Sequence, residues 1–195
     1  MKNWIMASFN PGKIAEFQAL MPQDIHLISL KDIPQAVSPE ESGDTLAENA
    51  ELKANYAAQL AGLPAFADDT GLMVDALNGA PGVHSARYAG LTANHSDNIL
   101  KLLNALQGRT DRQARFETVL CLVGVMPEPV FFSGILKGTI ASEPKGSGGF
   151  GYDSVFIPEG FTQTLAEVGA EVKNQISHRG NAMKEFQNWL SKNVR

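Results

Sequence analysis

Two long stretches of apolar and β-branched residues, 114–125 and 130–140, constrain the fold of this chain more than any other feature. Only Met126-Pro127-Glu128-Pro129 separates them, and such a proline-rich connection favours a turn. The pair therefore predicts an antiparallel hairpin. Each stretch could extend about 35–40 Å at the usual rise per residue. Strands of that length are uncommon in globular domains, so we expect a curved sheet that bridges two lobes.

Strand-like and helical patterns alternate through the rest of the chain. Residues 4–7 and 25–30 predict strands, with apolar residues at helical spacing between them. Thr45 followed by Glu48 forms a capping-box pattern, so a helix should start there and run to about Ala61. The other predicted elements are short strands at 63–67 and 72–76, a helix capped by Asn94 or Ser96 that ends before Gly108, a strand at 155–157, a short helix at 164–168 and a last helix after residue 181.

Composition limits the class of protein. The 195 residues suit one domain or a two-lobed one, and the apolar share of 44% is enough for a sizeable core. The net charge of −5 argues against nucleic-acid binding through a basic face. The single cysteine, Cys121, excludes an intramolecular disulfide, and no apolar stretch reaches the roughly 20 residues of a membrane span. The N-terminal apolar run is too short for a signal peptide, so we expect a cytoplasmic location.

Two adjacent carboxylates, Asp68 and Asp69, follow the apolar stretch 63–67, and Gly71 comes directly after them. Buried carboxylates are costly unless something positive lies against them. A hard divalent ion such as Mg²⁺ would satisfy the pair, because it prefers carboxylate oxygens and leaves room for substrate phosphates. A turn or a helix N-cap is an equally open interpretation, because Asp, Thr and Gly all favour such places.

The N-terminal loop is a candidate phosphate site. A predicted strand leads into Ser8-Phe9-Asn10-Pro11-Gly12-Lys13, and a helix follows. The first turn of a helix offers free N–H groups and the positive end of a dipole, both of which suit phosphate. Lys13 lies where that dipole disfavours a cation, which suggests an anion between them. An ordinary surface lysine remains the alternative.

A glycine-rich stretch at 144–153 presents Phe150, Tyr152 and Asp153. An aromatic face can stack on a purine, and a nearby carboxylate can accept hydrogen bonds from ring N–H groups. The stretch matches neither a Walker loop nor a dinucleotide fingerprint. Lys173, His178 and Arg179 cluster before the last predicted helix, which suggests a further phosphate or nucleobase site, with a basic surface loop as the alternative.

Six motifs in order now carry a resemblance to a known family. They are Ser8-x-Asn10-x-x-Lys13-x-x-Glu16, Glu41-Ser42-Gly43-x-Thr45-x-x-Glu48-Asn49-Ala50-x-x-Lys53-Ala54, Ala67-Asp68-Asp69-Thr70-Gly71-Leu72, Gly79-Ala80-Pro81-Gly82-Val83-x-Ser85-Ala86-Arg87-Tyr88, Gly148-Gly149-Phe150-Gly151-Tyr152-Asp153 and Ile176-Ser177-His178-Arg179-Gly180. Together they resemble the inosine/xanthosine triphosphate pyrophosphatases over nearly the whole chain. Several motifs in order are far more specific than any one of them.

The resemblance implies an α/β fold in which a long, mixed, curved β-sheet is flanked by helices. A single two-lobed domain would span residues 1–195, with an active-site cleft between the lobes. The implied reaction is Mg²⁺-dependent hydrolysis of non-standard purine nucleoside triphosphates (ITP, dITP, XTP and dXTP) to a monophosphate and pyrophosphate. A small-molecule nucleotide substrate, no nucleic-acid or membrane partner, and a homodimer are expected.

The resemblance also implies roles for individual residues. The loop from Ser8 to Lys13 (Ser8, Phe9, Asn10, Pro11, Gly12, Lys13) would hold the triphosphate. Lys13 and Lys53 would neutralise phosphate charge, and Asp69 would be the general base. Glu41, Asp68 and Asp69 would hold the metal, and Thr70 would touch the substrate. The base and phosphate pocket would be completed by Phe150, Gly151, Tyr152, Asp153, Lys173, His178 and Arg179.

Some positions depart from the family's usual residues, and two other functions stay open. Phe9, Leu46 and Ser154 stand where other residues are common, but none of these changes removes a functional group. One alternative is a Maf-type pyrophosphatase that prefers pyrimidine or modified nucleotides. The other is a nucleotide-binding module without catalysis.

Overall fold

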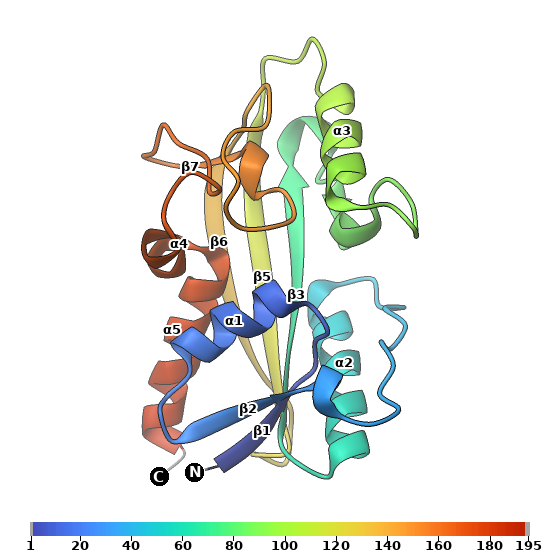
Figure 1. Ribbon diagram of the computed structural model, residues 1–195, viewed down its shortest axis with the longest axis vertical. Coiled ribbons are helices and arrows are strands. Elements are labelled where there is room, and N and C mark those ends of the chain that lie inside the picture. Colours follow the sequence, from blue (N-terminus) through green and yellow to red (C-terminus); the bar gives the residue numbers. More distant parts are fainter. Residues whose placement is uncertain (1, 194–195) are drawn as a thin grey trace. The chain divides into compact units, whose positions relative to one another are not determined.

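The computed structural model describes residues 2–193, which form a seven-stranded sheet with α-helices packed against it (Figure 1). The strands are β1 (Lys2–Met6), β2 (Ile25–Ser29), β3 (Ala65–Val74), β4 (Pro81–Gly82), β5 (Gln113–Val123), β6 (Val130–Ile140) and β7 (Phe156–Pro158). The α-helices are α1 (Pro11–Leu20), α2 (Leu46–Ala61), α3 (His95–Ala105), α4 (Ala170–Ile176) and α5 (His178–Asn193). Short 3₁₀ helices lie at Leu30–Asp32, Asp75–Leu77, Ser85–Arg87 and Asp153–Val155. No helix among these residues is long and apolar enough to cross a membrane.

The sheet is mixed, as the family resemblance implies. Its strand order is β2-β1-β3-β5-β6-β7, and β4 pairs with β3. β1 pairs in parallel with both β2 and β3, whereas β7 is antiparallel to β6 and β4 is antiparallel to β3. β5 and β6 are neighbours joined by only a short turn, and the Ile140 amide bonds to the Arg112 carbonyl at the far end of the pair. This pairing confirms the predicted hairpin, because a parallel crossover needs a much longer connection.

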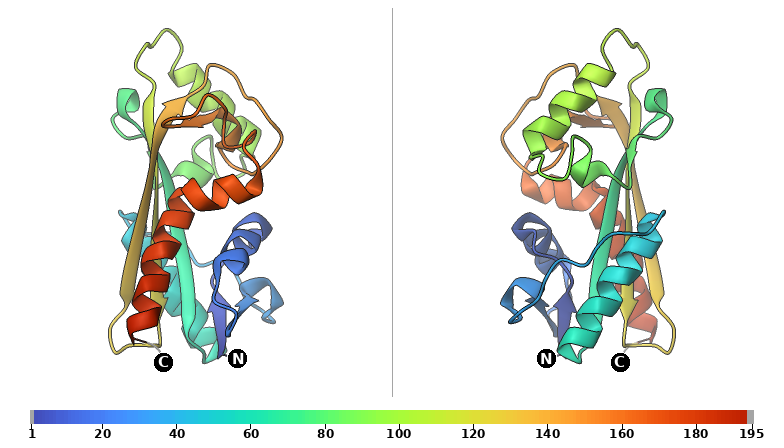
Figure 2. Two further views of the ribbon diagram at one scale, coloured as in Figure 1. Left: turned by 90° about the vertical axis from the view of Figure 1, so that its left-hand side faces the viewer. Right: turned by 90° about the vertical axis from the view of Figure 1, so that its right-hand side faces the viewer.

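The chain divides into two compact units. Unit 1 contains the residues up to 69, residues 118–134 and the residues from 179 onward, and unit 2 contains 70–117 and 135–178. In unit 1, α5 and α2 flank the strands, on the left and on the right in Figure 1, and the two views of Figure 2 bring each helix to the front in turn. Phe66, Phe17 and Phe186 pack in a core on the side of α1 and α5, and Ala65 and Ala67 pack against α2.

Unit 2 has its own hydrophobic core. Leu102 and Leu106 at the end of α3 pack with Phe116 from β5, Ile140 from β6 and Phe156 from β7. The rings of Phe116 and Phe156 lie 4.6 Å apart, centroid to centroid. Asn94 caps α3 through a capping box with Asp97, which settles the choice between Asn94 and Ser96.

The prediction of two short strands around the acidic pair is wrong. β3 runs without interruption from Ala65 to Val74, so Asp68, Asp69 and Gly71 lie inside a strand and form neither a turn nor an N-cap. Gly71 serves close packing here, because a Cβ atom at this position would lie 2.7 Å from the Gly82 carbonyl oxygen on β4. The strand tolerates the two carboxylates because cationic side chains cover both of them.

The C-terminal helices also differ from the prediction. Residues 164–168 form one turn, in which the Glu167 and Val168 amides both bond to the Thr164 carbonyl, and no helix follows until α4. Lys173 lies in α4, which the sequence pattern did not reveal because α4 has only seven residues and little apolar periodicity. Ser177 has an extended backbone, and α5 starts directly after it, so the predicted basic cluster lies on two helices and not in a loop.

Candidate functional site

Asp68 and Asp69 point to opposite faces of the sheet in unit 1. Successive side chains of a strand alternate between faces. Phe66 packs with α1 and α5, whereas Ala65 and Ala67 pack with α2. Asp68 therefore faces the side of α1 and α5, and Asp69 faces α2. Their ion pairs follow this division.

Asp68 is enclosed by two cations. Its Oδ2 lies 2.9 Å from Lys13 Nζ and 3.5 Å from Arg179 Nε. Arg179 also pairs with Glu16, with Nη1 3.0 Å from Oε2. Burial alone would raise the pKa of Asp68, but Lys13 and Arg179 outweigh it and hold this pKa well below its usual range. The two cations therefore favour the ionised form of Asp68, which makes it a poor base.

Asp69 has a different environment. Its Oδ1 lies 2.6 Å from Lys53 Nζ, and the same ammonium group lies 3.1 Å from Glu41 Oε1. Asn49 Nδ2 donates to Asp69 Oδ2 at 3.5 Å. Burial raises the pKa of Asp69 despite the attraction of Lys53. Burial opposes the charge of Lys53, but the surrounding carboxylates raise its pKa, so Lys53 remains protonated.

The N-terminal loop is folded by its own polar groups. Asn10 caps α1, because its Oδ1 accepts hydrogen bonds from the amides of Gly12 at 2.9 Å and Lys13 at 3.2 Å. The Asn10 amide in turn donates to Ser8 Oγ at 3.1 Å. Pro11 occupies the first helical position, which it suits because it has no N–H. This arrangement carries Lys13 on the first turn of α1, from which it reaches Asp68.

Three predicted base-pocket residues lie together in unit 2. Asp153 Oδ2 accepts hydrogen bonds from the Phe150 amide and from Lys173 Nζ, both at 2.8 Å. Lys173 Nζ also lies 4.9 Å from the centroid of the Phe150 ring, within the range of a cation–π interaction. Phe150 remains half-buried. The group thus combines a half-buried aromatic residue with an ammonium group.

Two other predicted residues of unit 2 are turned into the protein. Tyr152 is 5% exposed, and its hydroxyl donates to the backbone carbonyl of Ser85 at 2.8 Å. His178 is 1% exposed and stacks on Phe116, with centroids 4.6 Å apart and an interplanar angle of 20°. The remaining predicted residues, Thr70 and Gly151, are half-buried.

The three carboxylates predicted as metal ligands are covered by cationic side chains. Within residues 2–193, no three His, Cys, Asp or Glu side chains are grouped so that they could hold a metal ion. However, Glu41 and Asp69 share one ammonium group, that of Lys53. These hard oxygen donors match the chemistry of Mg²⁺, and Lys53 marks the point where a cation is stabilised by both.

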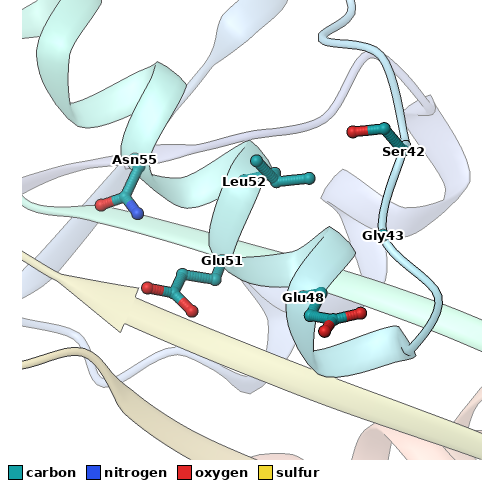
Figure 3. Close-up of a pocket in the computed structure, with 6 residues that line it drawn as sticks. All are labelled: Ser42, Gly43, Glu48, Glu51, Leu52 and Asn55. Atoms are coloured by element: carbon teal, nitrogen blue, oxygen red, sulfur yellow. The ribbon is translucent and has the colours of Figure 1, made fainter.

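A pocket of about 330 Å³ lies beside α2 and is lined by Ser42, Gly43, Glu48, Glu51, Leu52 and Asn55 (Figure 3). None of the predicted catalytic or binding residues lines it. Asn49 holds the adjacent loop, because its Oδ1 accepts a hydrogen bond from the Gly43 amide at 2.8 Å. The pocket is therefore separate from the ion pairs of Asp68 and Asp69.

The sequence profile of the Ham1 family matches residues 4–189. The chain belongs to the Ham1 family. It is 48% identical to the dITP/XTP pyrophosphatase of Flavobacterium johnsoniae over 93% of this chain and 94% of that protein. It is also 48% identical to the dITP/XTP pyrophosphatase of Porphyromonas gingivalis, over 97% of this chain and 98% of that one.

Solved Ham1 structures share the fold. The Ham1 protein of Staphylococcus aureus superposes with a TM-score of 0.88 at 42% identity, covering 98% of this chain and 99% of that chain. A nucleoside-triphosphatase, named as a dITP/XTP pyrophosphatase, from Mycobacterium abscessus gives 0.76 at 39% identity, covering 94% and 98%. The α/β fold with a mixed sheet is thus that of Ham1 proteins.

The structure of this Ham1 chain brings the predicted residues together in three groups. These are Lys13, Asp68 and Arg179; Glu41, Lys53 and Asp69; and Phe150, Asp153 and Lys173. Sequence reasoning assigned no role to Glu16, Asn49 or Ser85. Glu16 stands one helical turn after Lys13, and Asn49 stands one turn before Lys53, so helical spacing alone could have indicated both. Ser85 belongs to the fourth motif, Gly79 to Tyr88, and that motif is the only sequence signal that marks it.

Proposed function

We propose that this Ham1 chain hydrolyses non-standard purine nucleoside triphosphates (ITP, dITP, XTP and dXTP) to the monophosphate and pyrophosphate. The observation that carries the proposal is Asp69, a buried carboxylate with a raised pKa beside the ammonium group of Lys53. A base works best when its pKa approaches the working pH. The names of the full-length relatives at 48% identity support the same reaction.

The proposal assigns the phosphates to residues of unit 1. Lys13, Lys53 and Arg179 bring three positive charges to the two faces of β3. They are positioned in advance by Asp68, Asp69 and Glu16, so little reorganisation is needed when phosphate binds. The loop at 8–12 would offer further backbone N–H groups if phosphate replaced the bonds that the Asn10 and Gly12 amides make to Ser8 Oγ and Asn10 Oδ1.

The proposed cofactor is Mg²⁺. Of the three carboxylates predicted to hold it, Glu41 and Asp69 fit best, because they already share a cation on one face of β3. Asp68 lies on the other face and serves Lys13 and Arg179. When bound, Mg²⁺ would offset negative charge on the phosphate oxygens and on the leaving pyrophosphate.

In the proposed reaction, Asp69 removes a proton from a water molecule. The proton goes to Oδ2, since Oδ1 is held by Lys53. The water oxygen forms a bond to the α-phosphorus, and the bond from that phosphorus to the α–β bridging oxygen breaks. Lys13 and Lys53 stabilise the charge that develops on the departing pyrophosphate.

The base is assigned to residues of unit 2. Phe150 offers a ring for stacking, and Lys173 offers N–H donors beside it. Such donors favour the keto oxygen of a deaminated purine. The amino group of adenine would leave Lys173 facing another donor, which gives selectivity against ATP. Guanine already has the 6-keto oxygen, so selectivity against GTP would have to come from leaving its 2-amino group unpaired. We also propose that the protein is cytoplasmic and forms a homodimer. Light scattering of the purified protein would test the dimer.

A pyrophosphate-release panel tests the function. ATP, GTP, ITP, dITP, XTP and dTTP are compared with Mg²⁺ at equal concentration. We expect kcat/KM for the deaminated purines to exceed that for ATP and GTP by at least about a hundredfold. Faster turnover of dTTP would favour a Maf-type enzyme, and binding of ITP without pyrophosphate release would indicate a module without catalysis. Either result would refute the proposal.

A further inference from the structure

Tyr152 differs from the other aromatic residue of the proposed base pocket because its polar end is already bound within the protein. Its side chain is almost fully buried, and its hydroxyl donates to the Ser85 carbonyl at 2.8 Å. Phe150 is half-buried and has no polar group. The two rings, two residues apart in sequence, are therefore suited to different tasks.

Ser85 is itself fixed to β3. Its Oγ accepts a hydrogen bond from the Leu72 amide at 2.8 Å and donates to the Gly82 carbonyl at 2.6 Å. Ser85 is 7% exposed, so water competes little with either bond. Leu72 stands three residues after Asp69 in the same strand. The acceptor of the Tyr152 hydroxyl is thus held by the strand that carries the acidic pair.

Residues 85–90, which we call the anchor loop, are also held by α3. Asn98 is 2% exposed; its Oδ1 accepts from the Ala89 amide at 2.7 Å, and its Nδ2 donates to the Ala86 carbonyl at 3.0 Å. Lys101 Nζ donates to the Tyr88 carbonyl at 2.6 Å. Because β3 and α3 both hold the anchor loop, the carbonyl that accepts the Tyr152 hydroxyl is fixed in position.

The segment around Tyr152 contains flexible glycines, so a fixed hydrogen bond helps to define its conformation. Gly149 and Gly151 both have positive φ angles, +72° and +63°, in the region that favours glycine. Glycines on both sides of Phe150 give its backbone many alternatives in solution, and a buried hydrogen bond nearby selects one of them. Tyr152 is followed by Asp153, which holds both the Phe150 amide and Lys173.

We propose that Tyr152 is a positioning residue: its hydroxyl, docked on the Ser85 carbonyl, places Phe150 and Lys173 for the purine base, and Phe150 alone supplies the stacking ring. This inference rests on the proposed function. It predicts that the Tyr152 hydroxyl acts on substrate binding and on base selection. The chemical step, which it assigns to unit 1 residues, should proceed at nearly its normal rate once substrate is bound.

Tyr152→Phe tests the proposal, because it removes the hydroxyl and keeps the ring. We expect KM for ITP to rise roughly three- to tenfold, the effect of losing one hydrogen bond, with kcat within about twofold. The preference for ITP over ATP should fall by a similar factor. Tyr88→Phe is the matched control: it removes a hydroxyl from the anchor loop but leaves the Tyr152–Ser85 bond in place, so KM should not change.

Ser85→Ala provides a second route to the same result. It keeps the carbonyl that Tyr152 uses but removes both Oγ bonds, which loosens the anchor loop from β3. We expect the same direction of change in KM. Because the two residues act in series, the double variant should lose less than the product of the two single losses. If Tyr152→Phe fails to fold, the KM of Ser85→Ala alone tests the positioning role.

The possible outcomes separate the inference from the proposed function. A wild-type protein that does not prefer ITP refutes the proposed function and, with it, this inference. A wild-type protein that prefers ITP, with a Tyr152→Phe variant that loses thermal stability but keeps its KM and base preference, leaves the function intact and overturns the positioning role. A fall in kcat at unchanged KM would also overturn it, because the hydroxyl would then act in the chemical step.

Discussion

Asp68 and Asp69 are neighbours in β3, yet their asparagine variants should fail in different ways. Asp68→Asn removes the carboxylate that faces Lys13 and Arg179. Arg179 keeps Glu16, but Lys13 loses the carboxylate that lies 2.9 Å from its ammonium nitrogen. Asp69→Asn removes a carboxylate from Lys53, which keeps Glu41. The first variant should mainly lose stability, and the second should mainly lose catalysis.

The magnitude for Asp68→Asn follows from the burial of the pair. Breaking a buried ion pair by removing one partner costs about 3–5 kcal/mol. The Lys13 side chain is 18% exposed, so solvent relieves part of the penalty and the lower end, about 3 kcal/mol, is expected. For a chain of this size each kcal/mol lowers Tm by about 2–4 °C, so Tm should fall by roughly 6–12 °C.

Asp69→Asn should lower kcat by about 10²–10⁴-fold, the usual contribution of a general base. Its stability cost should be smaller, about 1–3 kcal/mol, because Lys53 keeps one carboxylate partner. Thermal unfolding without Mg²⁺ measures the loss of stability. Pyrophosphate release at saturating ITP with Mg²⁺ measures kcat. Asp75→Asn is the matched control, since Asp75 is exposed and only 3.8 Å from an exposed Arg115; both quantities should stay near wild type.

The reverse pattern would refute this reasoning. If Asp68→Asn unfolds at the wild-type temperature but loses kcat by more than a hundredfold, the charge network does not carry stability. If Asp69→Asn releases pyrophosphate within tenfold of wild type, Asp69 is not the base. Either result would mean that the opposite surroundings of the two carboxylates do not define their roles.

Three further predictions concern acid stability, the metal and the hairpin. The lowered pKa of Asp68 means that its ionised form stabilises the folded state above its unfolded pKa of about 3.9, and this stabilisation is lost as pH falls towards the folded pKa. The unfolding free energy of Asp68→Asn, followed by urea titration, should therefore vary less below about pH 4. Glu41→Gln should raise the half-saturating Mg²⁺ concentration for ITP hydrolysis by at least about tenfold, while Mg²⁺-independent stability changes little. Arg112 donates to the carbonyls of Ile140, Ala141 and Leu106, so Arg112→Met should lose about 2–3 kcal/mol in thermal unfolding without altering KM for ITP.

Local patterns in the sequence were enough for many elements. The Thr45 and Glu48 capping box forms as predicted, with the Glu48 amide 3.2 Å from Thr45 Oγ1 and the Thr45 amide 2.9 Å from Glu48 Oε2. Gly62 ends α2 in the left-handed conformation. The hairpin and the family membership are confirmed as well. These features depend on spacing within a few residues or on many motifs in order, both of which one sequence displays.

The partners of the charged residues could not be predicted in this way. Arg179 meets Asp68 across 111 residues of sequence, and Tyr152 meets Ser85 across 67. Such contacts depend on how the strands are ordered in the sheet, which no local pattern encodes. The continuity of β3 was missed for a related reason: Asp, Thr and Gly favour turns locally, and only the tertiary cations make a strand acceptable for two buried carboxylates.

The continuity of β3 decides how charge is distributed around the acidic pair. In a turn, both carboxylates could face one side and share one ion. In a strand they alternate, so each carboxylate meets its own ion-pair partners. On the side of α1 and α5, Asp68 pairs with Lys13 and Arg179, and Arg179 also pairs with Glu16. On the side of α2, Glu41 and Asp69 both pair with the ammonium group of Lys53. Burial raises the pKa of Asp69 and the charge of Glu41 adds to this effect, so a divalent cation would gain most on this face. We therefore expect Mg²⁺ at Glu41 and Asp69, whereas Asp68 holds Lys13 and Arg179 ready for the phosphates.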